Sequence, residues 1–141
     1  MILYAESSAV LAWLFGEKPG EQVRSVLSDA DSVVGSDLTL IECDRAIRRG
    51  MVLGAMDRAV ADALKSRLES TASCWNILRI LPEIVVRARQ PFPDEPIRTL
   101  DAIHVASALH IRAAVPGIKL LTLDARIRKV GFSLGFPIAP V

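Results

Sequence analysis

Short apolar runs alternate along this chain with longer segments in which apolar residues recur every three or four positions. The runs at 1–5, 31–36, 75–81 and 118–123 predict buried strands, and 136–140 predicts a last edge strand. The segments between them predict helices at 7–16, 19–28, 38–49, 57–70, 82–89, 99–114 and 125–135. This alternation is typical of a parallel sheet with helices on both faces. We therefore expect a three-layer α/β/α fold around a central parallel sheet of four to five strands.

Polar and glycine residues indicate where the first helices begin and end. Ser7 or Ser8 is a natural cap for the first helix, and Gly50 is expected to close the helix at 38–49. The helix at 57–70 carries an apolar stripe with a spacing of four, made of Val60, Leu64 and Leu68. These two helices are separated by a short link, so we expect an αα-hairpin.

Composition limits the classes of protein that this sequence can encode. With 141 residues, 51% of them hydrophobic and only 5% aromatic, we expect a single domain over 1–141 with an aliphatic core. Cys43 and Cys74 match no disulfide or metal pattern and are expected to be buried, reduced thiols. No uncharged run is long enough to cross a membrane, and no leader pattern opens the sequence, so a cytoplasmic location is expected.

Four acidic residues lie where predicted strands end and helices begin. They are Glu6, Glu42, Asp101 and Asp124, and they are spread over almost the whole sequence. The carboxyl ends of parallel strands share one edge of a sheet, so we expect these side chains to converge. Clustered carboxylates keep their charge when a cation joins them, and oxygen ligands favour Mg²⁺ or Mn²⁺. The pattern indicates metal-assisted phosphodiester hydrolysis.

Other interpretations of the same residues remain open or fail. Each acid taken alone has a structural alternative, such as an ion pair between Glu42 and Arg45 or a helix cap at Asp124. The GFSLG run at 131–135 matches a nucleophile elbow, but no acid or histidine follows it. A single Glu6 without a second acid two residues later disfavours an aspartyl phosphatase. His104 is interpreted as a hydrogen-bonded structural residue or a neighbour of the acidic site.

Several motifs give the chain its resemblance to the PIN domain family, specifically to VapC-type toxin ribonucleases. Residues 4–9 read YAESSA, 36–42 read SDLTLIE, 100–109 read LDAIHVASAL, 120–124 read LLTLD, and 134–137 read LGFP. The third of these is the most specific, and the resemblance covers essentially the whole length. It implies an endoribonuclease that uses Mg²⁺ or Mn²⁺, held by the four acids. It also implies a cognate VapB-like antitoxin, an RNA substrate and a homodimer, without a membrane partner.

Further residues receive supporting roles from this resemblance. Ser7 and Thr122 are adjacent to acids and are expected to orient ligands or water. Candidate contacts to RNA phosphates are basic residues near the acids, namely Arg45, Arg49, Arg98 and Arg126, with Arg128 and Lys129 nearby. The family's first acid is normally aspartate, whereas this chain has Glu6. The longer side chain supports an alternative function, a weak or inactive PIN-like module that binds RNA or protein.

Overall fold

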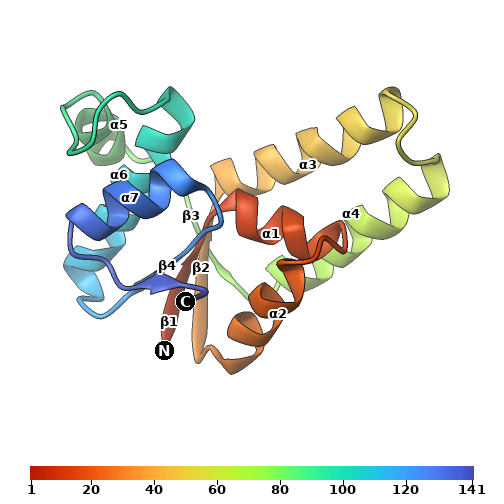
Figure 1. Cartoon of the computed structure of the whole chain (residues 1–141), viewed down its shortest axis with the longest axis horizontal. Helices are drawn as coiled ribbons and strands as arrows, with labels where there is room; N and C mark the ends of the chain where they lie inside the picture. The colour runs from red at the N-terminus through yellow and green to blue at the C-terminus, as the bar shows by residue number, and fades with distance from the viewer.

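The computed structural model describes residues 1–141 and contains one sheet of five parallel strands (Figure 1). The strands are β1 (Ile2–Ala5), β2 (Ser32–Ser36), β3 (Asn76–Leu78), β4 (Lys119–Leu121) and β5 (Ile138–Ala139). Their order, β3-β2-β1-β4-β5, places the first strand of the chain at the centre of the sheet. The predicted parallel sheet and its layered class are therefore confirmed.

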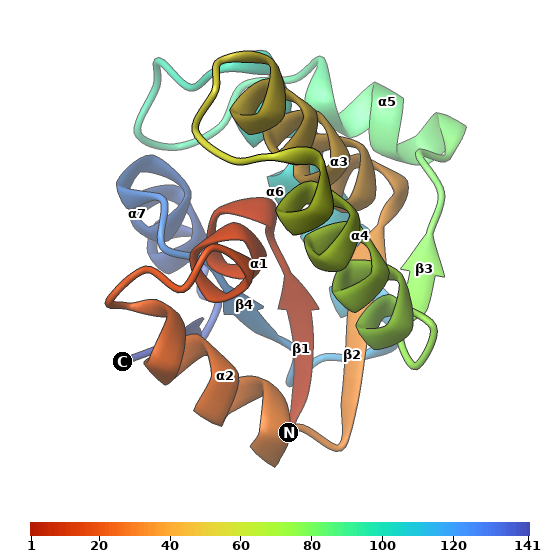
Figure 2. The same ribbon diagram turned by 90° about the vertical axis from the view of Figure 1, so that its right-hand side faces the viewer.

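Helices cover both faces of this sheet (Figures 1 and 2). One face carries α1 (Ser7–Leu14), α2 (Gly20–Asp29), α3 (Asp37–Val52) and α4 (Arg58–Ala72), and the other carries α5 (Pro82–Ala88), α6 (Thr99–Ala114) and α7 (Ala125–Ser133). Side chains of a strand alternate between the two cores, as their geometry requires. In β1, Leu3 and Ala5 pack under α1 to α4, whereas Tyr4 packs under α5 to α7.

The expected αα-hairpin is formed by α3 and α4, which pack along each other and project from the sheet (Figure 1). Gly50 does not end α3, which continues to Val52. A Cβ atom at Gly50 would lie 2.7 Å from the Met56 side chain, so the glycine makes room for the hairpin turn. The turn itself uses Gly54 in a left-handed conformation, with φ at 76°. In the predicted apolar stripe of α4, Leu68 is buried, but Val60 is 47% exposed.

Three other expectations are wrong in detail. The strands β3 and β4 are only three residues long, shorter than the apolar runs at 75–81 and 118–123 that predicted them. The cap of α1 is Glu6 rather than Ser7 or Ser8, since its carboxylate accepts from the Ser8 backbone N–H. Cys43 is buried, but Cys74 is exposed at the turn that follows α4. No helix has the length and apolar character that a membrane crossing requires.

Candidate functional site

The four predicted acids are placed by the strand ends and by the helices that follow them. Glu6 comes directly after β1, and Asp124 follows β4 and caps α7. Glu42 lies in the second turn of α3, which begins where β2 ends, and Asp101 lies in the first turn of α6. Because β1, β2 and β4 are adjacent and parallel, Glu6, Glu42 and Asp124 lie at one edge of the sheet. Arg98 links Asp101 to Asp124 there.

Glu6 is almost completely buried, with 3% of its surface exposed, and its carboxylate is fully hydrogen-bonded. Oε1 accepts from the Ser7 hydroxyl at 2.8 Å and from the Ser8 backbone N–H at 3.1 Å. Oε2 accepts from the Thr122 hydroxyl at 2.7 Å and from the Ser8 hydroxyl. A carboxylate has about four acceptor positions, so Glu6 is saturated by its own neighbours.

Glu42 is connected to Glu6 through a shared serine and a histidine. The Ser7 hydroxyl, which has a single proton to donate, lies 2.8 Å from Glu6 Oε1 and 3.0 Å from Glu42 Oε1. His104 Nε2 lies 2.5 Å from Glu42 Oε1 and 3.8 Å from Glu6 Oε1. One ligand atom each from Glu6, Glu42 and His104 lie within 4.8 Å of one another. The alternative role for Glu42, an ion pair with Arg45, is not seen in the structure.

Tyr4 contacts His104 from the buried side of the site. The phenol is fully buried in β1, and this burial raises the pKa of Tyr4 to about 12, so it remains a hydrogen-bond donor. Its oxygen lies 2.9 Å from His104 Nδ1 and 3.2 Å from the Ser36 hydroxyl. Tyr4 therefore contacts the imidazole of His104 at Nδ1, while Glu42 contacts it at Nε2.

The electrostatic environment keeps Glu42 ionised. Partial burial by itself raises the pKa of its carboxyl group, but the hydrogen bond and charge of His104 act in the opposite direction. The hydrogen bond from Ser7 and the charge of Arg98 add to this effect. The net result is a pKa below the ordinary value for glutamate, so the site presents an ionised carboxylate at neutral pH.

The other two acids are joined by Arg98, whose side chain is 66% exposed. Its Nε lies 3.4 Å from Asp101 Oδ2, and a terminal nitrogen lies 3.5 Å from Asp124 Oδ2. The Asp124 backbone N–H donates to the hydroxyls of Ser8 and Thr122, both of which also bond to Glu6. Asp124 is therefore connected to Glu6 through the hydroxyls of Ser8 and Thr122, and to Asp101 through Arg98.

The oxygen atoms that remain free are suited to a divalent cation. Glu42 Oε2 and Asp101 Oδ1 accept no hydrogen bond, and Asp124 Oδ2 contacts only Arg98. Carboxylate oxygens of this kind are the ligands that Mg²⁺ and Mn²⁺ prefer. The chemistry of these oxygens fits such an ion, but the group whose ligand atoms lie within 4.8 Å of one another is Glu6, Glu42 and His104, without Asp101 and Asp124. The thiol of Cys43 does not belong to this set, since burial and the nearby carboxylates raise its pKa to about 12.

Of the supporting residues predicted from the sequence, the two hydroxyl residues bond to an acid of the site and the arginines other than Arg98 do not. Ser7 and Thr122 both donate to Glu6, close to where their expected role requires them. Arg45, Arg49 and Arg126 are exposed and their side chains contact none of the four acids. Two neighbours have structural partners: Arg128 donates to two backbone carbonyl groups, and Lys129 pairs with an aspartate.

Sequence reasoning did not give Tyr4 or Ser8 a role at this site, and left His104 undecided. A signal was present for His104, because it follows Asp101 by three positions and therefore shares its helix face. Ser8 follows Glu6 by two positions, the distance at which a capping side chain meets the backbone of its helix. Nothing in the sequence indicates that Tyr4 points toward α6 rather than α1, since both faces of β1 are buried.

Comparison with known proteins places this geometry in a family context. The family model of the PIN domain matches residues 3–133. The chain is 27% identical to the ribonuclease VapC35 of Mycobacterium tuberculosis over 148 aligned positions, which cover 97% of this chain and 95% of that protein. The resemblance inferred from the motifs is therefore confirmed.

Solved structures show the same fold at low sequence identity. The FitAcB structure from Neisseria gonorrhoeae aligns with a TM-score of 0.73 and 18% identity, covering 98% of this chain and 96% of that chain. A toxin–antitoxin complex from Klebsiella pneumoniae aligns with a TM-score of 0.65 and 19% identity, covering 99% of this chain and 97% of that chain. Both likenesses concern the arrangement of helices and strands.

Proposed function

The chain belongs to the PIN domain family, and on this premise we propose that it is a metal-dependent endoribonuclease, the toxin of a type II toxin–antitoxin pair. The proposal is supported by its similarity to the ribonuclease VapC35. The observation that carries it is the convergence of Glu6, Glu42, Asp101 and Asp124 at one edge of the sheet. We propose that all 141 residues act as one PIN-like domain in the cytoplasm.

In this proposal the free carboxylate oxygens of Glu42, Asp101 and Asp124 hold Mg²⁺ or Mn²⁺, with Glu6 completing the set. When bound, such an ion polarises the scissile phosphate and supplies an activated water near neutral pH. His104 fixes the orientation of Glu42 by contacting Oε1, near which the hydroxyl shared between Glu42 and Glu6 also lies, and Oε2 is left free for the cation.

Arg98 has a different role in the same proposal. It neutralises Asp101 and Asp124 in the resting protein, at distances of 3.4 and 3.5 Å that are loose enough to release. Because its side chain is largely exposed, it can turn outward and bind an RNA phosphate once a cation takes its place. Arg45, Arg49 and Arg126 are proposed as further phosphate contacts, since they are exposed and carry no ion pair.

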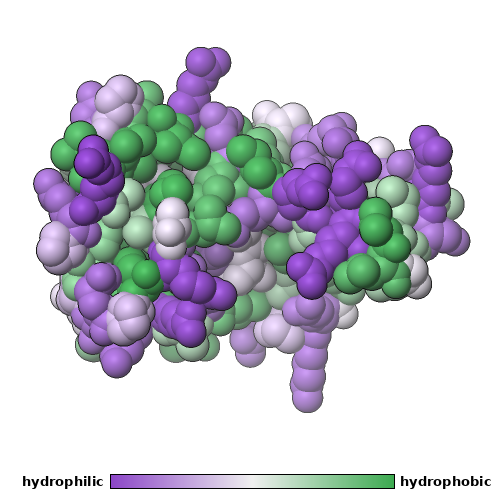
Figure 3. Space-filling view, turned by 90° about the horizontal axis from the view of Figure 1, so that it is seen from above, coloured by the Kyte–Doolittle hydropathy of each residue, from purple (hydrophilic) through white to green (hydrophobic).

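We propose two protein partners, a VapB-like antitoxin and a second copy of the chain. The toxin–antitoxin complex from Klebsiella pneumoniae, which shares the fold, supports the first. A hydrophobic patch on the half of the molecule that contains α5 supports the second (Figure 3). In α5, Val85 and Val86 are 45% and 57% exposed, although most of their surface is apolar. A dimeric mass by light scattering is expected, and a strictly monomeric mass contradicts this part.

A second candidate function, a weak or inactive PIN-like module that binds RNA or protein, is favoured by one observation. Every acceptor position of Glu6 is already occupied by Ser7, Ser8 or Thr122. A cation that uses Glu6 must first break one of these hydrogen bonds. Such a module retains binding but lacks cleavage, so the two candidate functions predict different outcomes in one assay.

The decisive experiment is RNA cleavage by purified protein with added Mn²⁺ or Mg²⁺. We expect cleavage that EDTA abolishes and that the substitution Asp101→Asn removes. Mn²⁺ binding, followed by the loss of its free electron paramagnetic resonance signal, should weaken in the same variant. Cleavage that persists in Asp101→Asn or in EDTA contradicts the proposed site. Metal binding without any cleavage favours the inactive module.

A further inference from the structure

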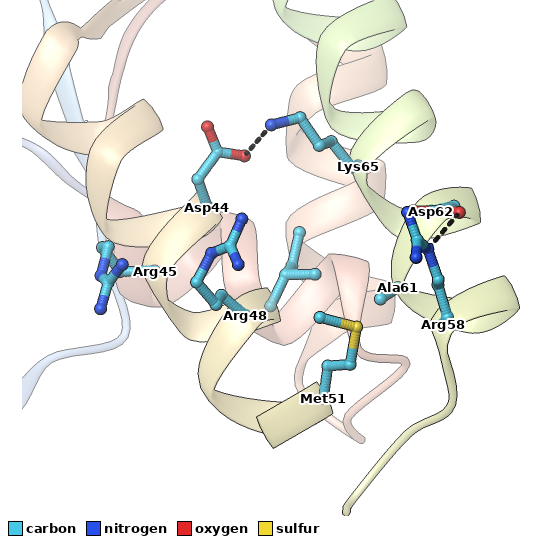
Figure 4. Close-up of a pocket in the computed structure, with 9 residues that line it drawn as sticks. Asp44, Arg45, Arg48, Met51, Arg58, Ala61, Asp62 and Lys65 are labelled. Atoms are coloured by element: carbon cyan, nitrogen blue, oxygen red, sulfur yellow. Dashed lines mark ion pairs between the residues drawn. The ribbon is translucent and has the colours of Figure 1, made fainter. Parts of the chain in front are cut away.

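The αα-hairpin contains a groove that is separate from the acidic edge of the sheet (Figure 4). Its volume is about 360 Å³, and its apolar floor is formed by Ile47 and Ala61, which are both buried. Side chains from α3 and α4 surround this floor, and four of them are basic, namely Arg45, Arg48, Arg58 and Lys65. Two acids, Asp44 and Asp62, also line it.

The acids of the groove neutralise only part of this positive charge. Lys65 Nζ lies 3.8 Å from Asp44 Oδ1 and bridges the two helices, whereas Arg58 lies 4.0 Å from Asp62 within α4. Arg48 forms no ion pair or side-chain hydrogen bond and, like Arg45, stands at the α3 side of the groove (Figure 4). The groove therefore has unpaired guanidinium groups above an apolar floor.

These unpaired arginines repel one another in the isolated protein. Arg45 lies three positions before Arg48 and four before Arg49, and both spacings make side chains neighbours on a helix. Like charges at these spacings are unfavourable, although Asp44, four positions before Arg48, offsets part of the effect. An anion that binds between them removes the repulsion, and a phosphate group matches the planar fork of a guanidinium.

The groove is connected to the acidic centre by helix α3 itself. Glu42 and Arg48 are six positions apart, which corresponds to roughly 9 Å along the helix axis. Arg45 lies between them, one turn after Glu42, on the border between the face that bears the acid and the face that lines the groove. A chain of positive groups therefore leads from the acidic edge into the hairpin.

From these observations we propose that the α3–α4 groove binds a backbone phosphate of the RNA strand, outside the scissile bond, through the unpaired Arg48 and through Arg58, whose only partner is Asp62 at 4.0 Å. This inference rests on the proposed ribonuclease function and extends it to a second contact region. No aromatic side chain lines the groove, so no base can stack there. The contact positions the strand through its backbone and is independent of base sequence.

The test measures RNA binding separately from cleavage. Single-stranded RNA bound to the cleavage-deficient Asp101→Asn protein is titrated by fluorescence anisotropy at several KCl concentrations. We expect Arg48→Gln to weaken binding several-fold and to lower the slope of log K against log salt by about 0.7, the value for one phosphate contact. The pair Arg48→Gln with Arg58→Gln should roughly double the change in slope, and Arg48→Lys should recover part of the affinity.

The matched control is Arg24→Gln, which removes one positive charge from α2. Arg24 is exposed and pairs only with Glu21, within its own helix. An equal loss of affinity in this control means that general charge, and not the groove, drives binding, which overturns the inference. Unchanged slopes in the groove variants overturn it as well, even where the wild-type protein cleaves RNA. If the wild-type protein neither cleaves nor binds RNA, the proposed function fails together with the inference.

Discussion

Helix α3 carries two regions with opposite properties. Near its start, Glu42 is held in place by Ser7 and His104 and belongs to a connected set of hydrogen bonds. Further along, Arg45 and Arg48 are exposed and form no ion pair. A reaction centre requires fixed geometry, because catalytic groups act over short distances. A strand-binding surface requires only charge in the right place, so its side chains can remain free until the ligand arrives.

The largest expected effect separates these two regions by their kinetics. We expect Glu42→Gln to lower kcat at least about 100-fold, because it removes charge where a cation supplies several kcal/mol of transition-state stabilisation. Arg48→Gln should instead raise KM several-fold and leave kcat almost unchanged, since a remote phosphate contact is the same in the ground and transition states. Steady-state cleavage of a fluorogenic RNA measures both constants.

A fall in kcat for Arg48→Gln would mean that the hairpin takes part in the reaction itself. The assignment of the reaction to the start of α3 and of strand binding to its later turns would then be wrong. Circular dichroism of each variant is the control, because both substitutions leave the buried residues of α3 in place.

The second prediction concerns the residues that orient Glu42. Loss of a side chain that orients a ligand typically costs 10–100-fold in metal affinity, and we expect His104→Ala to fall in this range. Tyr4→Phe keeps the packing but removes the hydroxyl that bonds to His104, so it should produce a smaller loss in the same direction. Isothermal titration with Mn²⁺ measures both. Full affinity in His104→Ala would show that Glu42 needs no orienting partner.

The two regions also differ in how well the sequence predicts them. Alternating apolar runs indicated the parallel sheet, and the strand ends indicated that four acids would converge. Their partners were harder to foresee, because hydrogen bonds such as Tyr4 to His104 depend on how β1 and α6 are rotated against each other. The exposure of Val60 has the same origin, since α4 turns Ala61 and Leu68 toward the interior instead.

The third prediction uses the pKa of Glu42. The pKa of Glu42 is lower in the folded protein than its ordinary value of 4.5. The ionised carboxylate therefore stabilises the folded state at pH values above 4.5. That contribution is lost as the pH falls through 4.5 and then through the lower pKa of the folded state. In urea denaturation from about pH 7 to about pH 3, with EDTA present, the wild-type protein should therefore lose stability more steeply than Glu42→Gln.

The control for this measurement is Glu69→Gln, which removes an exposed carboxylate that has no ion-pair partner on α4. Its stability curve should run parallel to that of the wild-type protein. If the stability curve of Glu42→Gln is also parallel to that of the wild-type protein, the contacts with Ser7 and His104 do not favour the ionised carboxylate, contrary to what their distances indicate.

The smallest expected effect concerns Glu6, which has a role both in the proposed reaction centre and in the cap of α1. Glu6 caps α1 through the Ser8 backbone and accepts from Thr122 on the far side of its carboxylate. We expect Glu6→Asp to keep the cap of α1, since aspartate is a good capping residue. The shorter side chain should, however, no longer reach the hydroxyl of Thr122. One oxygen then becomes free for a cation, so Mn²⁺ affinity should rise a few-fold, while unfolding becomes easier by about 1 kcal/mol because the buried Thr122 hydroxyl loses its acceptor.

Glu6→Gln is the companion variant, because it keeps the length of the side chain and removes its charge. It should weaken Mn²⁺ binding, since a neutral amide attracts a divalent cation less than a carboxylate does. Calorimetry for the metal and thermal unfolding for the fold, measured on both variants, separate the two roles. If neither variant changes Mn²⁺ affinity while both lower the melting temperature, Glu6 serves the α1 cap alone, and the cation is held by Glu42, Asp101 and Asp124 without it.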